Sequence, residues 1–281
     1  MKPRMETLIA SDGTPIRYSR QGQGRPVIFL HGWTAGSQEW LPFAAELTDE
    51  FEVYCWDARG HGGHPIDLDC DTHIARMVDD LQHLIEHHEL KEVVLVGHSM
   101  GALTTWEYIR TCGTDALSGI CILDQSPKLV TDASWGEGVY GDFDGQRNAR
   151  FIERLRDDFA EGVLELVAFG HNVRSRENYE RNSRGFQQIR EYLRTLPGEQ
   201  LTRCWASLTE QDYRAVLPQI DVPALLIYGD ESQFYSLDLA RWVAEQIPQS
   251  DLHIYENACH SPHMWHKDRF ISQLRDFSST L

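Results

Sequence analysis

The chain has 281 residues, of which 41 % are hydrophobic and 25 % are charged, as is usual for a globular protein with one large domain or two smaller ones. Its net charge of −17 argues against nucleic acid or an anionic membrane surface as a partner. The amino-terminal residues lack the apolar segment of a secretory signal, and no apolar run is long enough to span a membrane. We therefore expect a cytoplasmic protein.

The cysteines are scattered along the chain, and none stands in a C-x-x-C pair. Such a distribution indicates free thiols rather than a disulfide framework or a zinc site. No glycine-rich motif of the nucleotide-binding types occurs either. We therefore expect no metal and no cofactor. The six cysteines are Cys55, Cys70, Cys112, Cys121, Cys204 and Cys259.

The first third of the chain alternates between short apolar runs and segments with helical spacing. Asp12-Gly13 is a hairpin turn signal between two short strands. Further along, apolar runs of the kind that is buried in a parallel sheet alternate with apolar residues three and four positions apart. The expected strands are 8–10, 16–18, 26–30 and 51–56, and the expected helices are 39–47 and 72–88.

The most informative stretch is Val93 to Gly101. A run of aliphatic residues ends at Gly97-His98-Ser99-Met100-Gly101, and the residues 102–110 after it favour a helix. In this strand–turn–helix context, G-x-S-x-G is typical of a strained turn that exposes a nucleophilic serine. The two glycines lack a Cβ atom, so strand and helix can approach each other closely. The alternative is an ordinary turn whose serine only caps the helix.

After a strand at 120–123 the pattern changes, because residues 128–205 contain no clear strand. Charged, helix-like segments near 147–168 and 176–196 occupy this region. The alternation then resumes with strands at 223–228 and 252–255, a helix near 236–247 and a last helix from about 266. These units predict an α/β fold: a mostly parallel sheet with helices on both faces. The helical insertion after the sixth strand would lie over the carboxyl edge, where such sheets bind ligands.

The chain resembles the α/β-hydrolase fold family, in particular its serine hydrolases and esterases, over nearly its whole length. That resemblance implies a hydrolase core of residues 1–127 and 206–281 and a helical cap of residues 128–205. The motifs that carry it are His31-Gly32-Trp33, Asp57-x-Arg59-Gly60-His61-Gly62, Gly97-His98-Ser99-Met100-Gly101, Asp212-x-Arg214-x-x-Leu217-Pro218 and His260.

The resemblance implies a catalytic triad. Ser99 would be the nucleophile, and a serine hydroxyl needs a base beside it. His260 follows the last strand, where the family has its histidine. The acid usually stands in the loop after the strand ending at Tyr228, but Ser232 occupies that position here. Asp124, after the 120–123 strand, is therefore the favoured acid, and Asp230 is the alternative.

The oxyanion hole would consist of the backbone N–H groups of Met100 and Trp33. The other candidate residues would shape the substrate pocket. His98 flanks the serine, and His263 is expected at the pocket mouth. His31 and Trp135 complete the candidate pocket residues.

These residues predict a serine hydrolase that cleaves a small carboxylic ester, thioester or lactone through an acyl-enzyme intermediate. One alternative is a cofactor-independent dioxygenase or carbon–carbon-cleaving enzyme of the same fold. Members of the quinolone ring-cleaving group resemble this chain in the tryptophan of the oxyanion loop and in the place of the acid. A third possibility is a non-catalytic member that binds a small ligand. The sequence leaves open whether the protein forms a homo-oligomer.

Overall fold

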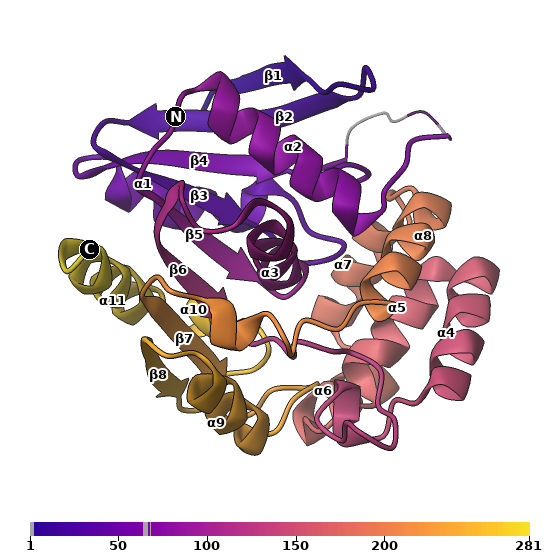
Figure 1. Cartoon of the computed structure of the whole chain (residues 1–281). Helices are drawn as coiled ribbons and strands as arrows, with labels where there is room; N and C mark the ends of the chain where they lie inside the picture. Colours follow the sequence, from indigo (N-terminus) through magenta and orange to yellow (C-terminus); the bar gives the residue numbers. More distant parts are fainter. Residues whose placement is uncertain (1–2, 64–66, 68) are drawn as a thin grey trace.

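A single eight-stranded sheet organises the computed structural model, which describes residues 3–63, 67 and 69–281. The strands lie in the order β1-β2-β4-β3-β5-β6-β7-β8, and β2 alone runs antiparallel to both of its neighbours, while the pairs from β4 to β8 are parallel. The strands are β1 (Met5–Ile9), β2 (Pro15–Gly22), β3 (Arg25–Leu30), β4 (Phe51–Asp57), β5 (Val93–His98), β6 (Leu117–Leu123), β7 (Ala224–Gly229) and β8 (Ser250–Tyr255). The predicted α/β fold with a mostly parallel sheet is confirmed (Figure 1).

Helices cover both faces of the sheet because the central strands are apolar on both sides. In β3, Val27 and Phe29 pack in one core with residues of α1 (Leu41–Leu47) and α11 (Lys267–Ser279). Their neighbours Ile28 and Leu30 pack in the opposite core. That second core includes residues of α2 (Ile74–His87), α3 (Met100–Cys112) and α9 (Leu237–Gln246).

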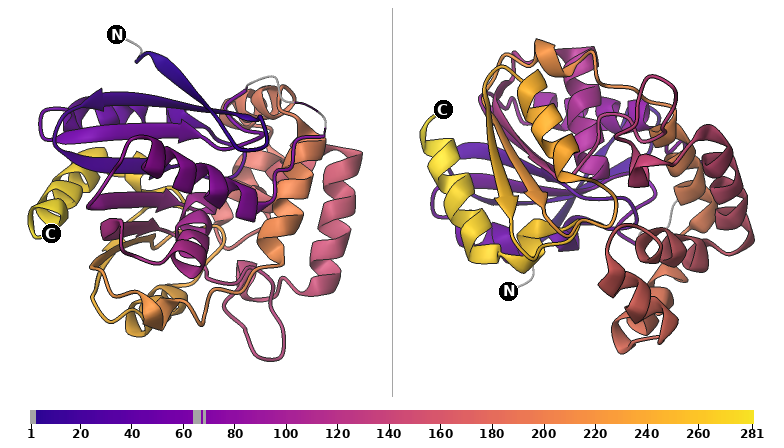
Figure 2. Two further views of the ribbon diagram at one scale, coloured as in Figure 1. Left: turned by 45° about the horizontal axis from the view of Figure 1, so that its top comes forward. Right: turned by 90° about the horizontal axis from the view of Figure 1, so that it is seen from below.

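Five α-helices lie between β6 and β7 and group beyond one side of the sheet in Figures 1 and 2. They are α4 (Gly145–Asp157), α5 (Phe159–Ala168), α6 (Val173–Glu180), α7 (Arg184–Leu193) and α8 (Gly198–Thr209). The proposed boundary at residue 205 falls inside α8, which continues to Thr209. We call α4–α8 the helical insertion.

The two long helical segments expected in the insertion are each divided in the structure. Asp158 ends α4 and caps α5, because its side chain accepts a hydrogen bond from the backbone N–H of Glu161. The break between α6 and α7 contains Asn182, whose φ of 48° is left-handed. The helix expected from residue 39 begins at Leu41, after a 3-10 turn at Ser37–Glu39.

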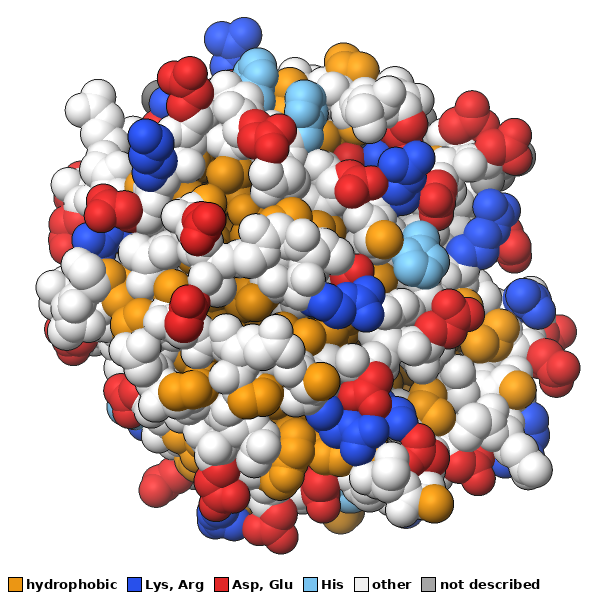
Figure 3. Space-filling model, in the orientation of Figure 1, with side chains coloured by type: hydrophobic (Ala, Val, Ile, Leu, Met, Phe, Trp, Pro, Cys, Tyr) orange, Lys and Arg blue, Asp and Glu red, His pale blue; other side chains and the backbone are white. Residues whose placement is uncertain are grey.

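The surface carries charges of both signs. On the face seen in Figure 3, acidic and basic side chains are interspersed rather than gathered in one patch. Among the described helices, none combines the length and the apolar character that a membrane-crossing segment requires.

Candidate active site

Ser99 stands in a strained turn between β5 and α3. Its φ of 52° and ψ of −115° lie outside the usual regions for a residue with a side chain. A Cβ on Gly97 would lie 2.5 Å from the carbonyl carbon of Gly101, and a Cβ on Gly101 would lie 2.0 Å from the backbone oxygen of Leu30. Only glycine fits at either position, so the two glycines allow β3, β5 and α3 to meet beneath Ser99.

Met100 and Trp33 line the same cavity as Ser99. Met100 is the first residue of α3, and the first N–H groups of a helix have no partner within it. Trp33 lies in the loop after β3, and its indole nitrogen donates to the backbone oxygen of Leu201 in α8 at 3.0 Å. The indole also packs against Trp205, with ring centroids 4.8 Å apart. The loop after β3 is thereby attached to the helical insertion.

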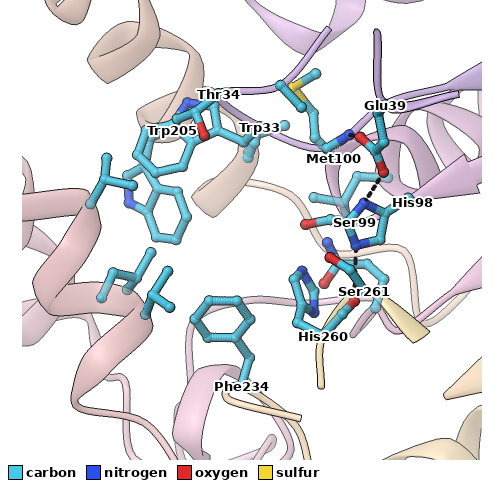
Figure 4. A pocket seen from close by; sticks show the side chains of 18 of the residues that line it. Trp33, Thr34, Glu39, His98, Ser99, Met100, Trp205, Phe234, His260 and Ser261 are labelled. Carbon is cyan, nitrogen blue, oxygen red and sulfur yellow. Dashed lines mark hydrogen bonds and ion pairs between the residues drawn. The ribbon is translucent and has the colours of Figure 1, made fainter. Parts of the chain in front are cut away.

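His260 and Asp124 form a close pair. Nδ1 of His260 lies 2.6 Å from Oδ2 of Asp124. An ionised carboxylate only accepts, so Nδ1 carries the proton and Nε2 is left as the basic nitrogen. Burial lowers the pKa of His260 from its ordinary value, against the opposing effect of the Asp124 carboxylate. His260 lines the cavity that Ser99 also lines, and Figure 4 shows the two side chains on the same side of it.

Asp124 is fully buried and is held by several donors. The Ser232 hydroxyl donates to its Oδ2 at 2.6 Å, and the Gly229 N–H donates to its Oδ1 at 3.2 Å. The alternative acid, Asp230, instead accepts a hydrogen bond from the backbone N–H of Ala258. The geometry therefore brings Asp124 to His260, as the absence of an acid at position 232 indicated.

Three of the four candidate pocket residues are not among the described residues that line the cavity. His31 is buried in its loop, where Nε2 accepts from the Ala58 N–H and Nδ1 donates to the Gly32 oxygen. Trp135 packs against Trp242 in α9, and its indole N–H donates to the backbone oxygen of Lys128. His263 is fully buried, whereas a position at the pocket mouth was expected. His98 does line the cavity.

Sequence reasoning missed Glu39. Its carboxylate lies against both His98 and His263, with Oε1 2.6 Å from Nδ1 of His98 and 3.0 Å from Nε2 of His263. One ligand-type atom from each residue lies within 4.8 Å of the others, so the donor set is of a kind that metal ions use. A carboxylate sixty residues before the serine carries no local motif that would have singled it out.

The cavity has a volume of about 760 Å³, large enough for a small organic molecule. Its far wall is apolar and comes mainly from the helical insertion, while Ser99 and His260 face it from the core (Figure 4). No lysine or arginine occurs among the described residues that line it. The principal apolar lining residues are Leu103, Val163, Leu166, Val167, Trp205 and Phe234.

We compared the sequence with protein families and with known proteins. The family described as alpha/beta hydrolase fold matches residues 25–267. The chain is 30 % identical over 280 residues to a non-heme chloroperoxidase of Kitasatospora aureofaciens, covering 95 % of this chain and 96 % of that protein. It is 27 % identical over 269 residues to a pimeloyl-acyl-carrier-protein methyl ester esterase of Vibrio vulnificus, covering 94 % and 98 %.

Solved structures share the fold. An esterase from Exiguobacterium antarcticum superposes with a TM-score of 0.82 at 22 % identity, covering 97 % of this chain and 98 % of that one. At this identity the likeness concerns the fold alone. The family match over residues 25–267 and the relative at 30 % identity show that the chain belongs to the α/β hydrolase fold family.

Proposed function

We propose that this protein is a serine hydrolase that cleaves a small carboxylic ester, thioester or lactone. The observation that carries the proposal is the contact between His260 and buried Asp124: Nδ1 of the ring lies 2.6 Å from the carboxylate, while the ring lines the cavity of Ser99. A histidine held in this way has its basic nitrogen available for a serine hydroxyl. The methyl ester esterase among the relatives supports ester cleavage.

In the proposed reaction, Nε2 of His260 takes the proton of the Ser99 hydroxyl as the oxygen attacks the carbonyl carbon. The backbone N–H groups of Met100 and Trp33 donate to the oxyanion, and each such donor is worth about 3 kcal/mol in the transition state. His260 then protonates the leaving alcohol, thiol or lactone oxygen. Water, deprotonated by the same nitrogen, attacks the acyl-enzyme and releases the acid, which restores Ser99.

The helical insertion would act as a cap that selects the acyl group. Its residues Val163, Leu166 and Trp205 give the cavity an apolar wall opposite Ser99. The absence of lysine and arginine among the described lining residues favours an uncharged acyl group over a dicarboxylic one. We therefore expect a neutral, apolar acyl chain or ring.

Active-site labelling tests the proposal. A fluorophosphonate probe is expected to label the wild-type protein, and a series of p-nitrophenyl esters is expected to show turnover. Ser99→Ala is expected to abolish labelling and to lower kcat by at least about a thousandfold. Ser118→Ala changes a serine on β6 that donates to the Glu92 oxygen, and it serves as the matched control. Absence of both labelling and ester turnover in the wild type would refute the proposal.

A second candidate is a cofactor-independent dioxygenase or carbon–carbon-cleaving enzyme, in which the His260–Asp124 pair deprotonates the substrate. The observation in its favour is the position of Asp124 after β6 and beside His260. In that position the chain resembles the ring-cleaving members of this fold. Oxygen uptake that survives Ser99→Ala and is lost in His260→Ala would select this candidate. Tight binding of a small ligand without any turnover would instead indicate a non-catalytic member.

A further inference from the structure

A buried group of three side chains lies behind the candidate nucleophile. We propose that Glu39, His98 and His263, which we call the Glu39 cluster, position the oxyanion loop and the His260 loop around Ser99, with His98 present as an imidazolium. This inference rests on the proposed function and names positioning residues for it. Figure 4 shows Glu39 and His98 next to Ser99. Dashed lines mark the contacts of the His98 ring with Glu39 and with the backbone oxygen of His260.

The Glu39 cluster connects three segments that are far apart in the sequence. Oε2 of Glu39 accepts a hydrogen bond from the backbone N–H of Gly32 at 3.0 Å, next to the oxyanion residue Trp33. Its other oxygen contacts His98, directly before Ser99, and His263. Nε2 of His98 in turn lies 2.9 Å from the backbone oxygen of His260. One carboxylate thus ties together the segments that carry the oxyanion donor, the nucleophile and the base.

The partners of the two ring nitrogens of His98 indicate its charge. The backbone oxygen of His260 only accepts, so Nε2 of His98 carries a hydrogen. Nδ1 of His98 and Oε1 of Glu39 are 2.6 Å apart, and without a proton between them their lone pairs would repel. That proton resides on His98, because the Gly32 N–H and the His263 ring both donate to Glu39 and favour its ionised form. Glu39 and His98 are therefore a buried ion pair.

The pKa directions agree with this assignment. Burial favours the neutral forms of both groups, but the His98 and His263 rings hold the pKa of Glu39 well below its ordinary value. Burial likewise opposes charge on His98, and the Glu39 carboxylate raises the pKa of that ring above its ordinary value. For His263, burial lowers the pKa to about 4, so this ring is neutral.

The ion pair acts directly on the proposed base. The His98 and His260 ring centroids are 5.0 Å apart, and the positive charge of His98 lowers the pKa of His260 while Glu39 raises it. The other ionisable groups that act on the pair are His263, whose ring centroid lies 4.8 Å from that of His98, and the more distant Asp124 and His31. Glu39 and His98 therefore have opposite effects on the base, and these can be separated by mutation.

A metal ion is the competing occupant of the Glu39 cluster. Two ligands of one tetrahedral zinc, each about 2.1 Å from the metal, would lie roughly 3.4 Å apart. The observed contacts of 2.6 and 3.0 Å are shorter than that and favour direct contact between the side chains. Metal analysis of the purified protein is therefore one arm of the test.

The experiment measures kcat, KM and the pH dependence of kcat/KM for a p-nitrophenyl ester in four variants of the Glu39 cluster and in one control variant. Glu39→Gln is expected to lower kcat at least tenfold with KM within about threefold, because the donors around Ser99 lose their common acceptor. His98→Phe removes the cation and keeps Glu39, so the acidic limb of the profile is expected to move to higher pH. In Glu39→Gln/His98→Phe both charges are gone, and the acidic limb of the kcat/KM profile is expected to return toward its wild-type pH.

His98→Gln is a second variant, which separates the loss of charge at His98 from a folding defect in His98→Phe. Its amide can still donate to the His260 oxygen but carries no charge, so it is expected to recover part of kcat and to keep the shifted limb. Glu107→Gln changes another buried glutamate, which pairs with Arg110 and lies outside the cavity lining, and is expected to leave both parameters unchanged.

The possible failures are distinguishable. Wild-type protein without ester turnover or labelling refutes the proposed function and this inference with it. An active wild type whose Glu39→Gln variant keeps kcat within twofold refutes the inference alone. The same holds if the His98 variants leave the acidic limb unmoved, or if the purified protein contains one equivalent of a divalent metal that a chelator removes with loss of activity.

Discussion

The hydroxyl of Ser232 donates a hydrogen bond to Oδ2 of Asp124 across 2.6 Å, and that same oxygen lies 2.6 Å from Nδ1 of His260. Ser232 stands where the resemblance leads one to expect the acid. The carboxylate beside His260 instead follows β6, and Ser232 is one of its hydrogen-bond donors. Asp124 itself has a φ of 47°, so its backbone is left-handed where its side chain turns toward His260.

This relationship predicts different outcomes for the two aspartates. Asp124→Asn is expected to lower kcat for a p-nitrophenyl ester on the order of ten-thousand-fold, because an amide can donate to Nδ1 and stabilise the wrong tautomer of His260. Asp230→Asn changes a carboxylate that accepts a hydrogen bond from the Ala258 N–H and does not contact His260 among the described hydrogen bonds, so we expect a change within a few-fold. A larger loss for Asp230→Asn than for Asp124→Asn would exclude the proposed triad.

Ser232→Ala should have a smaller effect. Hydrogen bonds to charged groups contribute about 1.5–3 kcal/mol, and Asp124 keeps the Gly229 N–H as a donor in the variant. We expect kcat to fall about tenfold or somewhat more while KM stays near the wild-type value. Burst kinetics with the same ester would measure the acylation step directly. Unchanged acylation would mean that Ser232 only fills space beside the carboxylate.

The pH dependence follows from the direction of the His260 shift. The ring must be neutral to take a proton from Ser99, and burial lowers its pKa below the ordinary value of about 6.5. His260 therefore stays neutral as the pH falls through 6.5, and the acidic limb of kcat/KM is expected to have its midpoint below that value. Asp124 opposes the shift, so the residual activity of Asp124→Asn should have its midpoint lower still. A wild-type midpoint above 7 would contradict this account.

Two features of the candidate site could be inferred from the sequence: the strained turn at Ser99 and the choice of Asp124. The glycines around Ser99 are required by close backbone approach, and that requirement is visible in five consecutive residues. Asp124 could be inferred because position 232 lacked a carboxylate. Both inferences depend on the order of elements along the chain, which parallel strands convert directly into neighbouring positions at one edge of the sheet.

Side-chain direction could not be predicted in the same way. His263 follows His260 by three residues but turns into the core, where it stacks on Trp40 with ring centroids 4.6 Å apart. His31 and Trp135 likewise point into packed surroundings. Glu39 was placed at the start of a helix, and only the pairing of distant segments shows that it is an acceptor beneath the site.

The apolar wall of the cavity predicts a change in acyl-chain preference. Val163 in α5 lines the cavity on the side of the helical insertion. Val163→Trp would fill part of the roughly 760 Å³, so kcat/KM for long acyl chains should fall at least tenfold relative to acetate or propionate esters. A p-nitrophenyl ester series from two to ten carbons would measure the ratio. Val173→Trp, at an exposed position of α6 outside the cavity, is the matched control. Equal losses at every chain length in Val163→Trp would indicate a general defect rather than a shorter pocket.

Stability is expected to depend on a buried ion pair outside the described lining of the cavity. Arg59, after β4, donates through Nε and Nη2 to the two oxygens of Asp80 in α2 at 2.6 and 2.7 Å, and both side chains are almost fully buried. Asp80→Ala leaves the guanidinium without its main partner, so we expect the free energy of unfolding to fall by about 3–5 kcal/mol.

Asp12 also contacts Arg59 but is partly exposed, and Asp12→Ala should cost only about 1 kcal/mol or less. Replacing both buried partners, as in Arg59→Leu/Asp80→Leu, should destabilise the protein less than Asp80→Ala does, because no unpaired charge remains in the core. Urea unfolding followed by tryptophan fluorescence would give all three values. If the double variant proves less stable than Asp80→Ala, the pair stabilises the fold beyond the cost of burying its charges, and the unpaired-charge explanation is wrong.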